Sequence, residues 1–279
     1  MHDDTAIATC RTVLYTANPH SKVAVIRNFL EGLKDTTKIP LGDTNAPLSL
    51  PDDPARPDDV MVCHPRDLPK RKISPDPQAR FTQLHALAHI ELNAIDLACD
   101  MVARFAHHID NSSLYSFVTD WLTIADEESL HFTMLDQRLA ELGGAYGDLA
   151  VHGRMWDMAR VTKDSLLGRL AVVPMVLEAR GLDVTPGMIA KFTQAGDHTS
   201  AKILQRILAD EVGHVACGRK WFEFACQDLP EAPEKIWHVM VRKYMPSGVR
   251  GPFNHEQRML AGLLPSYYEG FTPPPFDDG

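Results

Sequence analysis

The chain has 279 residues, of which 44% are hydrophobic and 23% are charged, so its composition is that of an ordinary globular protein. Acidic residues outnumber Lys and Arg by 37 to 28, which gives a net charge of −9. This charge disfavours a dedicated nucleic-acid-binding protein, because the binding surface of such a protein is normally basic. The sequence has no apolar run near the roughly 20 residues of a membrane span, and its start lacks the layout of a signal peptide. We therefore expect a cytoplasmic protein that does not insert into membranes.

The cysteines are scattered and include no Cys-x-x-Cys pair, which predicts reduced thiols. This spacing also disfavours iron–sulfur and zinc-ribbon sites. Because the sequence also has no dinucleotide-binding fingerprint, a redox reaction would need a separate electron donor. The five cysteines are Cys10, Cys63, Cys99, Cys217 and Cys226.

The first third of the chain predicts helices over residues 5–16 and 21–35. A stretch rich in proline and aspartate follows over residues 39–78. Because proline fixes φ and removes a hydrogen-bond donor, this stretch should run extended over the surface as an arm. We assign residues 1–75 to this region of helices and arm.

Apolar residues at three- and four-residue spacing then predict four long helices. The first begins at Asp76-Pro77, an N-cap followed by a first-turn proline, and ends near residue 108. The second covers residues 112–142 and stops at Gly143-Gly144. A connecting region, 145–163, should contain a short helix.

The third helix should cover residues 164–180, with a kink at Pro174 and a stop at Gly181 and the nearby Pro186. A short helix near 187–195 leads to the fourth, over 197–227. After a further helix at 231–244, the tail to residue 279 should be irregular. No segment alternates with period two over a strand's length. The predicted fold is all-α, a four-helix bundle over 76–230 with extensions at both ends.

The pattern Glu-x-x-His occurs in the second and the fourth helix, as Glu128/His131 and Glu211/His214. Residues three apart on a helix are about 60° apart around it and about 4.5 Å along it, so both side chains can reach one ion. Both pairs lie in long apolar helices. This setting, more than the short pattern itself, indicates a metal site.

The other two helices each contribute a glutamate within an apolar run, Glu91 and Glu178. The chain therefore repeats one order twice: a lone Glu, then Glu-x-x-His. Four carboxylates in an apolar interior are prohibitive alone, whereas two divalent ions cancel their charge. Oxygen ligands with two histidines suit two iron ions, with manganese as the alternative.

Each of these glutamates could instead be a half-solvated carboxylate paired with an arginine; the candidates are Arg104, Arg138, Arg180 and Arg206. Glu127 and Asp210 precede ligand glutamates and could orient a bound histidine, or be ordinary surface charges. His85 and His89 are interpreted as structural histidines. His89 lies about 200° around the helix from Glu91.

Four stretches carry a resemblance: His85-Ala-Leu-Ala-His89-Ile-Glu91, Asp126-Glu-Glu-Ser-Leu-His131-Phe132, Glu178 to Pro186, and Asp210-Glu-Val-Gly-His214-Val215. They resemble the ferritin-like superfamily, which includes rubrerythrin-like proteins and a tRNA hydroxylase, and more narrowly the bacterial domain of unknown function four-five-five. The resemblance covers most of residues 50–265 and implies a dinuclear site without naming a substrate. The ligands that it implies are Glu91, Glu128, His131, Glu178, Glu211 and His214.

The leading hypothesis is an O2-dependent di-iron oxidoreductase of the monooxygenase type, which acts on a small-molecule substrate. One alternative is iron handling, as a ferroxidase or a peroxide scavenger. Another is a non-catalytic metal-binding scaffold. A homodimer is compatible with the sequence.

Overall fold

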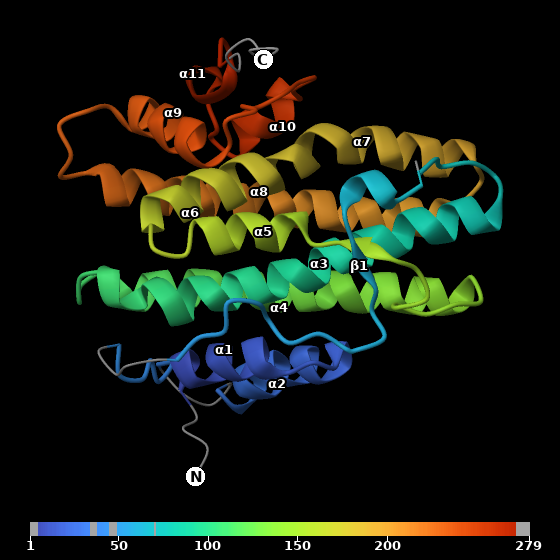
Figure 1. Ribbon diagram of the computed structural model, residues 1–279, viewed down its shortest axis with the longest axis horizontal. Coiled ribbons are helices and arrows are strands. Elements are labelled where there is room, and N and C mark those ends of the chain that lie inside the picture. Colours follow the sequence, from blue (N-terminus) through green and yellow to red (C-terminus); the bar gives the residue numbers. More distant parts are fainter. Residues whose placement is uncertain (1–4, 34–37, 45–48, 70, 272–279) are drawn as a thin grey trace. The chain divides into compact units, whose positions relative to one another are not determined.

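The computed structural model describes residues 5–33, 38–44, 49–69 and 71–271 (Figure 1). Helices make up most of these residues, which confirms the all-α prediction. Within the described ranges, no helix is both long and apolar enough to cross a membrane. The chain divides into an N-terminal unit, Met1–Trp156 with Ala195–Asp197, and a C-terminal unit, Asp157–Gln194 with His198–Gly279. Each unit holds one of the two helix pairs expected for a bundle, and domain boundaries at residues 75 and 230 stay a prediction.

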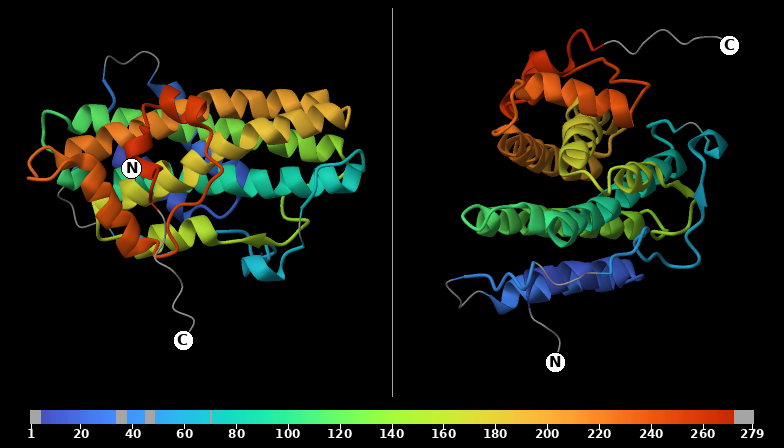
Figure 2. Two further views of the ribbon diagram at one scale, coloured as in Figure 1. Left: turned by 90° about the horizontal axis from the view of Figure 1, so that it is seen from above. Right: turned by 60° about the vertical axis from the view of Figure 1, so that its left-hand side comes forward.

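The N-terminal unit is built on two long helices, α3 and α4, which pack along each other (Figures 1 and 2). The Asp76 side chain caps α3 by accepting from the backbone N–H of Gln78, as its position before Pro77 predicts. Helix α1 packs on α3, and α2 packs on α4. The elements are α1 (Ala6–Tyr15), α2 (Pro19–Gly32), β1 (Val62–Cys63), the 3₁₀ turn η1 (Pro65–Asp67), α3 (Pro77–Phe105), the 3₁₀ turn η2 (Ala106–His108), α4 (Leu114–Glu141) and β2 (Val151–His152). Helix α5 (Arg154–Val161) spans the boundary between the units.

The proline-rich arm is largely irregular, as predicted, and hydrogen bonds fix it to the N-terminal unit. The backbone N–H of Ala6 donates to Pro40 O at 2.8 Å, and the Trp156 indole donates to Asp52 O at 2.7 Å. Strand β1, within the arm, pairs in parallel with β2. The sequence did not predict this pair, because two residues per strand are too few for an alternating pattern. Residues 1–4, 45–48, 70 and 272–279, and residues 34–35 of the second predicted helix, lie outside the described residues.

The C-terminal unit is built on a second pair, in which α8 packs against α6, a π-helical segment and α7. The elements are α6 (Leu166–Val172), the π-helical segment η3 (Val173–Glu178), α7 (Ala179–Gln194), α8 (His198–Cys226), α9 (Pro233–Tyr244), α10 (His255–Leu260) and α11 (Pro265–Tyr268). The prediction of an irregular tail after α9 was incomplete, because α10 and α11 lie there.

The predicted stop at Gly181 was wrong, and so was the separate helix near 187–195. Helix α7 runs through both Gly181 and Pro186. A glycine that ends a helix usually adopts a positive φ, and Gly181 does not. The buried face of α7 continues past Pro186 from Leu182 to Phe192, so packing outweighs the hydrogen bond that the proline removes.

Candidate metal centre

A buried cluster of two carboxylates and one imidazole lies between α3 and α4. His131 Nδ1 is 3.3 Å from Glu91 Oε2 and 3.2 Å from Glu128 Oε2. None of the three side chains is more than 4% exposed. Each offers a ligand atom within 4.8 Å of the others, close enough to share one metal ion. The N-terminal unit therefore brings together three of the six predicted ligands.

The local sequence explains how the cluster forms. Glu128 and His131 are one turn apart on α4, and Glu91 comes from the facing helix α3. Buried apolar residues precede and follow the ligands at helical spacing: Ala88, Leu92 and Ile95 on α3, and Ala125, Phe132 and Leu135 on α4. These neighbours keep water from the cluster, so each charge on it must be balanced by a nearby group.

The cluster contains two carboxylates and only one imidazole, and this imbalance shifts the pKa values of its members. Burial, reinforced by the nearby charge of Glu128, raises the pKa of Glu91 to about 8. Burial alone would lower the pKa of His131, but hydrogen bonds and charge interactions with Glu128 and Glu91 outweigh it and raise this pKa to about 11. The fold thus retains protons where two carboxylates meet, and a divalent cation can take the place of those protons.

The C-terminal unit carries the matching residues on its own helices. Glu211 and His214 lie one turn apart on α8, with 3.8 Å between Glu211 Oε2 and His214 Nδ1. The His214 side chain is 1% exposed and that of Glu211 is 13% exposed. Glu178 is half-buried on η3, which packs against α8. Both units therefore present one lone glutamate and one Glu-x-x-His pair on adjacent helices.

Glu178 is the last residue of the π-helical segment, where the sequence predicted a kink at Pro174. The backbone N–H of Ala179 donates to Pro174 O, five residues earlier, which is the hydrogen bond of a π turn. One extra residue in a turn changes the relative direction of the side chains on its two sides by about 100°. The direction of Glu178 therefore depends on this segment. Such turns occur frequently at functional sites.

A close helix contact fixes the start of the π-helical segment. A Cβ added at Gly218 of α8 would lie 2.3 Å from Pro174 Cβ, so this position has room only for glycine. We expect Gly218→Ala to lower the free energy of unfolding by about 1–3 kcal/mol, because η3 must shift. Gly213→Ala on the same helix is the control: a Cβ there meets nothing within 4 Å. It should stabilise by about 0.5–1 kcal/mol. Urea denaturation of both variants measures the difference, and equal stabilities would contradict the contact.

Comparison with known proteins confirms the narrower resemblance, to the domain of unknown function four-five-five. Residues 15–269 match a family model described as "Protein of unknown function (DUF455)". The chain belongs to this family. An "Uncharacterized protein" of Haemophilus influenzae is 37% identical over 256 residues, which cover 90% of this chain and 88% of that protein. No solved structure matches the chain.

The DUF455 match spans all six candidate ligands and the residues expected to support them. Asp210 pairs with Arg206, at 2.6 Å between Oδ2 and Nε, one turn away on its own helix. Roles for Asp210 and Glu127 in orienting a histidine stay predictions. Of the arginines considered as partners of the glutamates, Arg104 ion-pairs with Asp100 and Arg180 with Asp183.

The interpretation of two other histidines as structural agrees with their contacts. The backbone N–H of Gly147 donates to His85 Nε2 at 2.9 Å. His89 Nδ1 lies 2.8 Å from the Tyr146 hydroxyl, which places it in a separate polar network. Burial lowers the pKa of His89 to about 3, so this imidazole is neutral at physiological pH.

The sequence did not predict a buried charge cluster in the N-terminal unit. Lys22 Nζ lies 2.5 Å from Asp96 Oδ1, both side chains are fully buried, and Arg56 from the arm ion-pairs with the other oxygen of Asp96. Arg56 also donates to Asn93 Oδ1 at 2.8 Å. The signal available in the sequence was an aspartate inside an apolar run of α3. Its partners, from α2 and the arm, lie 74 and 40 residues away.

Proposed function

We propose that this protein binds two metal ions, preferably iron, and that it uses them as an O2-dependent oxidoreductase on a small-molecule substrate. The observation that supports the proposal most directly is the buried cluster of Glu91, Glu128 and His131. A second set of the same composition, Glu178, Glu211 and His214, would complete the centre. We propose that each of the two helix pairs supplies half of the ligands, as in the helix pairs of ferritin-like proteins.

The chemistry of the donor set fits this assignment. Each half offers two carboxylates and one imidazole, so one divalent cation per half leaves each half close to neutral. Carboxylate oxygens with few histidines suit iron or manganese, whereas structural zinc sites use cysteine or more histidine. Two ferrous ions, when bound, would supply electrons for the activation of O2. Reducing equivalents for further turnovers would come from a separate donor protein.

The residues of the chain provide the surroundings of such a centre. Glu91, Glu128 and His131 are held by two packed helices, so their positions do not depend on a loop. The apolar residues beside them exclude water, which strengthens the interaction of the carboxylates with a cation. The protons that Glu91 and His131 retain at neutral pH would leave when metal binds.

Metal analysis tests the proposal. The protein is purified without oxygen, loaded with Fe(II), freed of excess metal by gel filtration and analysed by mass spectrometry for metals. We expect two iron ions per chain, and a content well below two would refute the proposal. Continuous O2 uptake that depends on an added reductant supports an oxidoreductase. A single oxidation followed by growth of large iron-filled particles in light scattering supports iron handling instead.

A further inference from the structure

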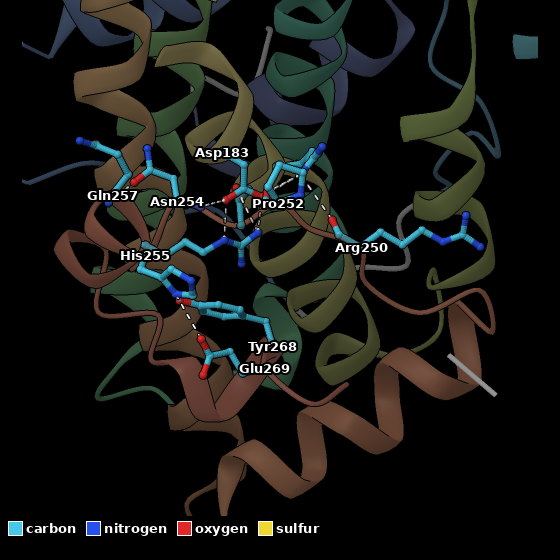
Figure 3. A network of polar contacts seen from close by, with 11 residues as sticks. Asp183, Arg250, Pro252, Asn254, His255, Gln257, Tyr268 and Glu269 are labelled. Atoms are coloured by element: carbon cyan, nitrogen blue, oxygen red, sulfur yellow. Dashed lines mark hydrogen bonds and ion pairs between the residues drawn. The ribbon is translucent and has the colours of Figure 1, made fainter. Parts of the chain in front are cut away.

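A buried ion pair in the C-terminal unit ties α10 to α7 (Figure 3). Arg258 Nε donates to Asp183 Oδ1 at 2.7 Å, and Arg258 Nη2 donates to Asp183 Oδ2 at 2.8 Å. The Arg258 side chain is 1% exposed and that of Asp183 is fully buried. A bidentate pair of this kind fixes the orientation of both partners as well as their separation.

Further contacts hold the same pair in place. The backbone N–H of Asn254 donates to Asp183 Oδ1 at 2.9 Å (Figure 3). Arg180 Nη1 donates to Pro252 O at 2.9 Å. The Arg258 guanidinium lies 4.8 Å from the ring centroid of Phe253 and 4.5 Å from that of Tyr268. Arg258 therefore lies against two adjoining aromatic rings, whose centroids are 4.7 Å apart, while its N–H groups face α7.

The guanidinium also reaches the backbone at the end of the π-helical segment. Arg258 Nη2 lies 3.4 Å from Ala179 O, as the donor of a long hydrogen bond. Ala179 follows Glu178 directly, and its N–H closes the π turn to Pro174 O. One side chain thus contacts the residue that closes the turn and also Asp183, one turn further along α7. At the start of the segment, Pro174 is held against Gly218.

We infer that Arg258 is a positioning residue for the metal ligand Glu178. It holds Ala179 and Asp183 in the register set by the π turn, and this register sets the direction in which Glu178 points. Loss of the π turn would rotate Glu178 by about 100° relative to the residues on one side of it. The inference rests on the proposed function, since it assumes that Glu178 is a ligand.

The test replaces Arg258 by lysine. Lysine keeps the charge and most of the stem, but it cannot make a bidentate contact and reach Ala179 O as well. We expect Arg258→Lys to weaken one of the two Fe(II) equivalents by about 10–100-fold in anaerobic calorimetric titrations, the range for residues that orient a ligand. Arg242→Lys is the matched control, since Arg242 is an exposed arginine of the same unit that lies over the ring of Phe271. This control should bind both equivalents as the wild type does.

A double-mutant cycle separates positioning from general loss of structure. If Arg258 acts through Glu178, Arg258→Lys should have no further effect on Fe(II) affinity in a Glu178→Gln background. An equal weakening in both backgrounds would overturn the inference, as would wild-type affinity in Arg258→Lys. Should Arg258→Lys not fold, Asp183→Asn tests the same pair, and wild-type Fe(II) affinity there would also overturn the inference. A wild-type protein that binds fewer than two iron ions would instead refute the proposed function.

Discussion

Replacement of Glu128 by glutamine is expected to reduce the iron content from two ions per chain to at most one, without destabilising the metal-free protein. Glu128 contributes one of two carboxylates within reach of His131, and glutamine keeps its shape but not its charge. In the metal-free cluster two carboxylates share one imidazole and the pKa of Glu91 is raised, so removal of one carboxylate should leave stability unchanged or raise it by about 0.5–2 kcal/mol. This combination of lost binding and retained stability is typical of a functional site.

Two measurements on each variant check this expectation: metal content after anaerobic Fe(II) loading, and urea denaturation in the presence of a chelator. Glu141→Gln is the matched control, because Glu141 lies on the same helix and is 58% exposed in an ion pair with Arg138. It should bind two iron ions with little change in stability. If Glu128→Gln retained two ions, or if it destabilised the protein strongly without affecting metal, Glu128 would be a structural residue.

The long helices could be predicted because their signals are local. Asp76 and Pro77 start α3 by chemistry that operates within one turn, and Gly143 ends α4 with a φ of 88° that favours glycine. Gly181 and Pro186 carry equally familiar signals, yet α7 continues through them. Whether a helix passes a glycine or a proline depends on how the next turn packs, and this information is not local.

The candidate site also has residues that the sequence could predict and residues that it could not. Periodicity and the need for charge balance sufficed to place Glu91, Glu128 and His131 together, because each lies on an apolar helix face. The π turn before Glu178 could not be read from the sequence, since Pro174 predicts an interruption but not its form. Arg258 could not be assigned at all, because its partner Asp183 lies 75 residues earlier in the chain.

Loss of the Asp96 carboxylate is expected to destabilise the protein more than any other single change considered, because it leaves a lysine buried without its anion. Burial already lowers the pKa of Lys22, and the charge of Asp96 partly offsets this effect. We expect Asp96→Asn to lower the free energy of unfolding by about 3–5 kcal/mol, the range for breaking one side of a buried ion pair. Lys22→Met should lower it less, since Asp96 retains Arg56 and methionine fills the space of the lysine stem.

Asp126→Asn is the control for this comparison. Asp126 lies 3.7 Å from Arg27 and also ties α2 to the α3–α4 pair, but both side chains are at least 40% exposed. Water screens such a pair, so its loss should lower stability by less than about 1 kcal/mol. Urea denaturation curves of the three variants give the order. A similar loss for Asp96→Asn and Asp126→Asn would mean that burial adds nothing to the pair. A large loss for Asp96→Asn alone would mean that α2 and the arm are anchored to α3 through one buried carboxylate, on the same helix that carries Glu91.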